Sequence, residues 1–177
     1  MPDTRGKGAG VGAALDRAVL SAISGFCATL PMTMVMWRLH RRLPSDERYA
    51  LPPREVSDEA AGRVVRGGSA GPPGTLAAHF GYGAAAGAIL GVLAPRPTLV
   101  QGAGFGLAIW AGSYFGWIPA TGLLKPASDH PRARNSLMLA AHAVWGCSLA
   151  WGLRELESSE ASFRGREHPD AEKPGRA

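Results

Sequence analysis

Charged residues divide the chain into four long uncharged stretches separated by polar segments. Asp, Glu, Lys and Arg are absent from residues 18–37, 75–94, 98–124 and 135–153, and they are frequent in the segments between and beyond these stretches. A helix rises about 1.5 Å per residue, so about 20 apolar residues cross the hydrocarbon core of a bilayer. A soluble helix of this length would keep a polar face. The pattern therefore predicts four membrane-spanning segments.

Helices suit these stretches better than strands do. Hydrocarbon offers no partner to a backbone amide, so spanning segments are helices or closed barrels. Barrel strands alternate over about ten residues, whereas these stretches are about twice as long and do not alternate. We therefore expect an all-α fold, a polytopic membrane bundle of four transmembrane helices within residues 18–153. A signal peptide would have a shorter apolar region, so residues 18–37 form a retained span.

The polar segments outside the spans suggest simpler roles. Residues 1–17 are short and Gly-rich, and we expect a flexible polar N-terminus. Residues 154–177 carry many charges and two prolines, which predicts a disordered charged C-terminal tail. The connection Pro95-Arg96-Pro97 is tight. We expect it to return the third span antiparallel beside the second.

The first long loop contains one further helical signal. The run Leu51-Pro52-Pro53-Arg54-Glu55 precedes three apolar residues spaced four apart, Val56, Ala60 and Val64. Proline is well suited to the first turn of a helix. We therefore predict a short amphipathic helix over about residues 53–66, lying at the membrane interface.

Glycine recurs at a spacing of four within the uncharged stretches. Lipid removes most of the hydrophobic attraction between helices, so close packing of small residues must hold them together. The second stretch carries Gly83, Gly87 and Gly91, and the third begins with Gly102 and Gly106. We predict that these glycines form helix–helix contacts. A homo-oligomer could also form through such faces.

Polar and aromatic side chains within the spans fall into one half of the membrane. Antiparallel threading places a candidate cluster near the face that carries the 38–74 loop: His79, Tyr114, Trp117, His142 and Trp145. Histidine inside a bilayer is costly, which makes it a functional candidate. Three interpretations stay open: hydrogen bonding in an interfacial aromatic belt, binding of a proton or ligand, and ligation of a metal or haem. No third metal ligand is evident, and we expect neither a metal nor a cofactor.

Composition adds little to this picture. The formal net charge is +5, but the basic residues are spread over tails and loops without a nucleic-acid motif, so we expect membrane lipids as partners and no nucleic acid. The cysteines Cys27 and Cys147 each lie in an apolar stretch and form no metal-binding motif. Lys and Arg are nearly balanced between the two faces, so the positive-inside rule predicts no orientation.

Four patterns together resemble a known family. They are the charged exit of the first span followed by Leu51-Pro52-Pro53-Arg54, the span with His79, the pair Gln101-Gly102 that opens a span with a proline-broken end, and His142-x-x-Trp145. In this order they resemble small bacterial inner-membrane proteins of the YagU-like kind, a family of unknown function. The resemblance covers about residues 18–155. It implies a four-span protein of the bacterial cytoplasmic (inner) membrane and transfers no catalytic residue. The acidic residues after the fourth span depart from the pattern.

The sequence predicts a non-enzymatic helical bundle with a structural or permeation-related role, because no nucleophile–base pair or metal set is present. The alternative is a membrane enzyme that acts on a lipid substrate. In that case the histidine cluster would supply acid and base, and Arg38, Arg41 and Arg42 would hold a headgroup phosphate.

Overall fold

The computed structural model describes residues 4–48, 50–65 and 67–167, and within these ranges the regular secondary structure is entirely helical. Five helices are longer than ten residues: α1 (Thr4–His40), α2 (Pro52–Val64), α3 (Gly71–Leu93), α4 (Leu99–Ala111) and α6 (Arg132–Glu167). Four shorter elements connect them: η1 (Ser45–Glu47), the π-helix η2 (Gly112–Trp117), α5 (Ile118–Ala120) and η3 (Ala127–Asp129).

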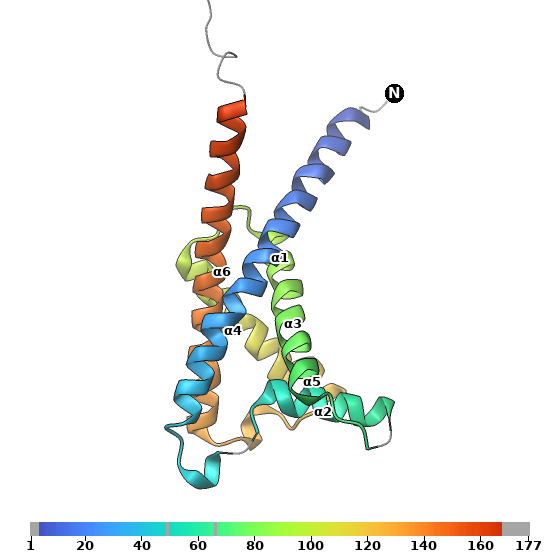
Figure 1. The fold of residues 1–177 in the computed structure, drawn as a ribbon, viewed down its shortest axis with the longest axis vertical. Coiled ribbons are helices and arrows are strands. Elements are labelled where there is room, and N and C mark those ends of the chain that lie inside the picture. Colours follow the sequence, from blue (N-terminus) through green and yellow to red (C-terminus); the bar gives the residue numbers. More distant parts are fainter. Residues whose placement is uncertain (1–3, 49, 66, 168–177) are drawn as a thin grey trace, which may run out of the picture.

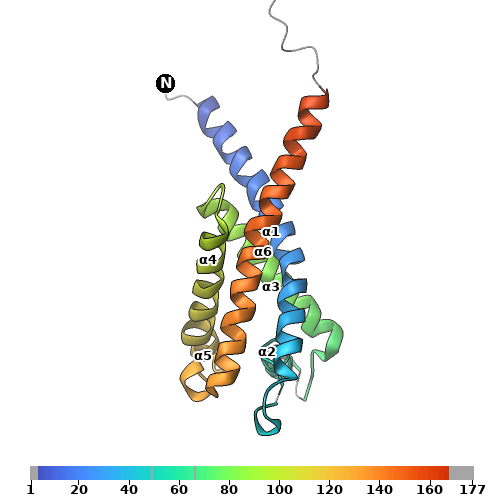
Figure 2. The same ribbon diagram turned by 90° about the vertical axis from the view of Figure 1, so that its left-hand side faces the viewer.

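Helices α1, α3, α4 and α6 run lengthwise along the bundle (Figures 1 and 2). Helices α1 and α6 cross and then splay apart, so that the beginning of α1 and the end of α6 project from the same end of the bundle (Figures 1 and 2). Helix α2 lies across the opposite end, with its axis roughly perpendicular to the bundle (Figures 1 and 2). The described ends of the chain are therefore on one side and α2 on the other.

Three helices are long and apolar enough to cross a membrane. The qualifying segments are Gly12–His40 in α1, Gly71–Leu93 in α3 and Arg132–Glu160 in α6. They overlap the first, second and fourth predicted spans. The third uncharged stretch is not among them, because its helix is divided into α4, η2 and α5.

The division of the third stretch has a local cause. Gly116 departs from helical geometry, with φ −111° and ψ −110°, at the end of the wider π-helical turns. Pro119 follows three residues later, and its ring nitrogen has no hydrogen to donate. Helical structure resumes only for Ile118–Ala120, and Gly122 then takes a positive φ of 70°, which glycine adopts without strain. The helical path therefore ends earlier than the predicted boundary at residue 124.

Glycines bring α1 and α3 into backbone contact. A Cβ on Gly87 would collide with the carbonyl oxygen of Ser21 and lie 3.0 Å from the Cα of Gly25. A Cβ on Gly83 would meet the Thr29 hydroxyl. At Gly91, a Cβ would lie 2.6 Å from the Ser21 Cβ. The predicted stripe on α3 thus lies against α1 of the same chain.

A second glycine contact joins α4 to α6. A Cβ on Gly102 would meet the carbonyl oxygen of Gly146, and one on Gly106 would meet that of His142. The turn between α3 and α4 is also attached to α6, since Arg154 Nε donates to Pro97 O at 2.9 Å. In the described part of the chain α4 packs mainly along α6 and α3 along α1. Our expectation that the third span lies beside the second was therefore wrong: two prolines turn the chain, but the glycines select the partner.

Helices α1 and α6 are longer than their uncharged stretches. Helix α1 begins at Thr4, where we expected a flexible segment over residues 1–17, and α6 continues to Glu167, into the predicted disordered tail at 154–177. No proline lies between these helix ends and the apolar segments, and most residues between Arg154 and Glu167 are good helix formers. Residues 1–3 and 168–177 lie outside the described residues.

Candidate functional site

A cavity of about 250 Å³, partly open to its surroundings, lies in the half of the bundle nearer α2. Its walls come from α1, α2, α3, α4, η2, α5 and α6. The lining is almost wholly apolar, with several aromatic rings. Since every one of these elements contributes, the cavity depends on the complete bundle and not on one local motif.

The structure brings the predicted cluster together around this cavity. All five members line it: His79, Tyr114, Trp117, His142 and Trp145. His79 comes from α3, Tyr114 and Trp117 from η2, and His142 and Trp145 from α6. The depth argument from the sequence placed them in one half of the membrane, and here they share one space.

The pairing of the helices through glycines leaves a space between α3 and η2. Helix α3 is held against α1, and α4 is held against α6, so α3 and η2 face each other without close packing. The wall that α3 presents includes the small residues Ala78, Gly83 and Ala86, which leave the space unfilled. The packing glycine Gly83 therefore also lines the cavity.

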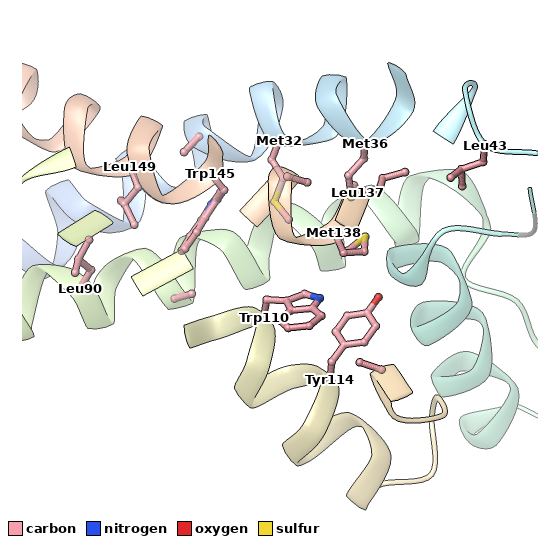
Figure 3. Close-up of a cluster of buried hydrophobic side chains, with 14 residues drawn as sticks. Met32, Met36, Leu43, Leu90, Trp110, Tyr114, Leu137, Met138, Trp145 and Leu149 are labelled. Atoms are coloured by element: carbon pink, nitrogen blue, oxygen red, sulfur yellow. The ribbon is translucent and has the colours of Figure 1, made fainter. Parts of the chain in front are cut away.

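Aromatic side chains form the wall beside α6. The rings of Trp110 and Tyr114 are nearly parallel, with centroids 5.6 Å apart (Figure 3). Both are buried, and Tyr114 lies toward Met138 of α6 (Figure 3). Phe105 of α4 stacks on Trp145, with centroids 6.1 Å apart. Tyr114 and Trp145, which line the cavity, are thus packed against Trp110 and Phe105, which do not.

Most polar groups in the lining already have hydrogen-bond partners. Thr29 Oγ1 donates to Gly25 O at 2.9 Å, and Trp145 Nε1 donates to the same carbonyl at 3.2 Å. Ser113 Oγ donates to Ile109 O at 2.7 Å. Because this uses the only hydroxyl proton of Ser113, the Tyr82 hydroxyl is the donor in their 2.9 Å contact.

Ser57, on the α2 wall, is also paired. Its hydroxyl donates to Arg54 O at 3.1 Å and lies 2.8 Å from Thr75 Oγ1. Five hydroxyl and indole groups of the lining therefore form hydrogen bonds within the protein: those of Thr29, Ser57, Tyr82, Ser113 and Trp145.

The two histidines differ from these groups. Nδ1 of His142 bonds Met138 O at 2.8 Å, so in the neutral ring the proton is on Nδ1 and Nε2 is an acceptor. Nε2 of His79 is buried and has no hydrogen-bond partner among the described residues. His142 therefore has an acceptor nitrogen, and His79 a second buried ring nitrogen, for which no hydrogen-bond partner is found among the described residues.

The lining carries no Asp, Glu, Lys or Arg. No group of three or more His, Cys, Asp or Glu that could hold a metal occurs among the described residues. Neither serine in the lining bonds a histidine in the described structure. The arrangement suits the binding of a neutral molecule better than acid–base or nucleophilic chemistry.

Helix α2 supplies a wall that the sequence did not assign to the site. Pro52, Pro53, Val56 and Ala60 all face the cavity. The run Leu51–Glu55 and the four-residue apolar spacing predicted this helix, and the observed bounds Pro52–Val64 lie within two residues of those expected. Which cavity it would line depends on tertiary contacts that no local pattern encodes.

Two arginines hold α2 in place. Arg134, at the start of α6, is fully buried; it forms an ion pair with Glu55 and donates to Ala50 O at 2.9 Å. Arg63 donates to Thr121 O at 2.6 Å and to Gly122 O at 2.7 Å. These bonds join the beginning of α2 to the start of α6 and the end of α2 to the last residues of the third stretch.

The arginines considered for a headgroup phosphate lie away from the cavity. Arg38, Arg41 and Arg42 are exposed and line no part of it, and the Arg41 guanidinium lies 4.7 Å from the centre of the Trp37 ring. Gln101, of the pair that opens the third stretch, forms a capping box with Thr98 at the start of α4. Both features are therefore explained without the site.

Comparison with protein-family models, curated proteins and solved structures finds no match for this chain. The function must therefore be inferred from the geometry of the cavity.

Proposed function

We propose that this chain is a non-enzymatic, four-span protein of the bacterial inner membrane whose cavity binds a small apolar molecule taken from the bilayer. Its role would be permeation-related: the bundle would take up such a molecule from the bilayer or release it. The observation that carries the proposal is the charge-free, aromatic-walled cavity within a bundle of apolar helices. Cofactor and binding sites are typically concave and mostly apolar, with a few placed polar groups.

Four crossings are supported by the dimensions of the third stretch. Residues 99–120 form an almost continuous helical path of α4, η2 and α5. As a straight α-helix, 22 residues would extend about 33 Å, and the π-helical turns and the bend at Gly116 bring this path closer to the roughly 30 Å of the hydrocarbon core. The projection of both described chain ends from one side of the bundle also favours an even number of crossings (Figure 1). Helix α2, lying across the opposite end, would then rest at the interface.

A lipid environment is supported by the outer surface of α1. Large apolar side chains are exposed along its length at spacings of three and four: Leu15, Val19, Ile23, Phe26, Leu30, Met34 and Trp37. A continuous exposed apolar face of this kind is unfavourable in water and favourable in hydrocarbon. The assignment to the bacterial inner membrane is supported by the YagU-like order of sequence patterns.

Binding of an apolar probe tests the proposal. The purified protein in detergent is dialysed against radiolabelled naphthalene, and the uptake of protein-free micelles is subtracted. We expect saturable binding to the wild type and its loss in Ala86→Phe, because Ala86 is buried and lines the cavity. The neighbouring Ala85 is exposed and does not line the cavity, so Ala85→Phe should bind normally.

Circular dichroism and gel filtration would establish that both variants remain folded. Absence of saturable binding in the wild type would contradict the proposal, and so would equal binding by a folded Ala86→Phe.

A further inference from the structure

We propose that the molecule held in this cavity is uncharged and carries a hydroxyl group, which the imidazoles of His79 and His142 recognise. The inference rests on the function proposed above and narrows its ligand to one chemical class: small alcohols or phenols with an apolar body.

The size of the cavity limits the apolar body. A dry cavity of about 150 Å³ lined by aliphatic and aromatic side chains accommodates a benzene molecule. The cavity here has a volume of about 250 Å³, which leaves room for a second ring or a short chain. A complete phospholipid is far larger, although one acyl chain could enter in part.

The absence of charge in the lining excludes ionised ligands. Moving a carboxylate or an ammonium group into an apolar space is costly unless an opposite charge or several hydrogen bonds await it. The lining residues include no Asp, Glu, Lys or Arg. The buried Arg134 is engaged with Glu55 and the backbone outside the cavity and supplies no counter-charge there.

The hydrogen bonds within the lining define the polar group of the ligand. The hydroxyls of Tyr82 and Ser113 are linked to each other and to Ile109 O, so their protons are used. His142 differs, because its Nδ1 proton goes to Met138 O and leaves Nε2 as an acceptor. A pure hydrocarbon would leave this acceptor unsatisfied, whereas a hydroxyl donor would satisfy it.

His79 extends the same argument. Its Nε2 atom is buried without a hydrogen-bond partner among the described residues, and such atoms are rare in folded proteins. A hydroxyl both donates and accepts, so it can donate to Nε2 of His142 and accept from Nε2 of His79 in the tautomer that carries the proton there. A carbonyl oxygen could only accept, and it would leave Nε2 of His142 without a donor.

Three probes with one ring system separate the possibilities: naphthalene, 1-naphthol and 1-naphthoate, each radiolabelled and dialysed at neutral pH against the full-length protein in detergent. Binding is corrected for uptake into protein-free micelles, so that the differing micelle partition of the probes cancels. We expect 1-naphthol to bind about tenfold more tightly than naphthalene, the gain of one net hydrogen bond. We expect no saturable binding of 1-naphthoate.

Histidine variants assign the recognition. His142→Phe should abolish the preference for 1-naphthol and still bind naphthalene, whereas His142→Gln keeps an acceptor and should retain part of the preference. His79→Phe should reduce the preference. His40→Phe makes the same chemical change in α1 away from the cavity lining, and it should behave as the wild type.

Each result separates this inference from the function on which it rests. Equal affinity for naphthol and naphthalene, tightest binding of naphthoate, or a preference that survives in both His79→Phe and His142→Phe would overturn the hydroxyl inference while the apolar-binding function stands. Failure of naphthalene to bind saturably would overturn the function itself.

Discussion

At the scale of single residues, glycine has two different roles in this chain. Gly25, Gly83 and Gly87 lie where two backbones meet, and a side chain at any of them would contact the main chain of the neighbouring helix. A Cβ built on Gly81 or Gly104 meets nothing within 4 Å. The spacing of four separates the two groups within α3 and α4, because Gly83 and Gly87 belong to the predicted stripe whereas Gly81 and Gly104 are out of register with it.

The contrast between Gly87 and Gly81 of α3 gives a direct prediction. Gly87→Ala would place its methyl group against the Ser21 carbonyl and the Gly25 Cα, and these backbone atoms cannot rotate away. We expect it to reduce the free energy of unfolding by about 1–3 kcal/mol, as for an overpacked core. Gly81→Ala should be neutral or slightly stabilising, since alanine favours a helix. Unfolding by SDS titration, followed by circular dichroism, measures both, and equal losses would contradict the contact.

A second residue-scale prediction concerns pH and His130, in the turn before α6. Burial lowers the pKa of His130, and the nearby Arg134 guanidinium lowers it further. The folded state therefore resists protonation of this ring more than the unfolded state does, for which the pKa is about 6.5. The stabilisation is complete above that value and is lost as the pH falls through it toward the lower pKa of the folded state.

The measurement compares the wild type with His130→Asn. Unfolding titrations between about pH 8 and pH 5 bracket the unfolded-state pKa. We expect the wild type to lose more stability than the variant over this range, while the variant keeps an amide donor for Lys125 O, which now lies 3.2 Å from His130 Nε2. Identical pH dependence of the two proteins would show that His130 does not titrate as described.

At the scale of elements, α2 is a separate wall attached to the bundle by polar contacts. Its lining residues pack against the cavity, but its connections to the third stretch and to α6 are formed by Arg63 and Arg134. Exposed pairs add little to stability, whereas removing one partner of a buried pair leaves a charge without compensation. The contact of Arg134 with Glu55 should therefore dominate, because Arg134 is fully buried.

Arg134→Met tests this attachment. The change leaves the Glu55 carboxylate and the Ala50 carbonyl without their donor, and we expect a loss of about 3 kcal/mol, the lower end of the range for a broken buried pair, because Glu55 is partly exposed. Hydrogen exchange should rise selectively over Pro52–Val64. Arg132→Met, at an exposed position two residues earlier, serves as the control; equal exchange in both variants would show that Arg134 does not hold α2.

At the scale of the whole molecule, the sequence predicted where the long apolar helices lie along the chain. It predicted neither where these helices end nor which of them pack together. Uncharged stretches mark where hydrocarbon can surround a helix, so they located three long apolar helices. They do not mark where a helix ends, which is why α1 and α6 extend beyond them to Thr4 and Glu167. The pairing of α3 with α1 depended on backbone contact at glycines, and no one-dimensional pattern identifies the partner.

The candidate site was also predictable only in part. Depth along the spans was sufficient to group His79, Tyr114 and His142, and all three line one cavity. The α2 wall and the engagement of Tyr82 with Ser113 could not be deduced, because they depend on how elements distant in sequence meet. The binding experiments with the His79 and His142 variants test whether these side chains recognise a ligand.

The number of crossings is the property of the whole molecule on which the remaining inferences depend, and Arg96 and Ser128 distinguish the alternatives. They lie in the turns before and after residues 99–120. If this segment crosses the bilayer, single cysteines at the two positions, in a chain whose Cys27 and Cys147 are replaced by alanine, will react with a membrane-impermeant maleimide from opposite sides. Ser45→Cys should then be labelled from the same side of the membrane as Ser128→Cys. Ser159→Cys should be labelled from the same side as Arg96→Cys.

Right-side-out and inverted vesicles give the two accessibilities, and labelling after detergent addition controls for buried thiols. A three-crossing chain would label Arg96→Cys and Ser128→Cys from the same side. That result would remove η2, with Tyr114 and Trp117, from the bilayer. The cavity would then be bounded by water on one wall, and an apolar ligand would have no reason to prefer it to the surrounding lipid.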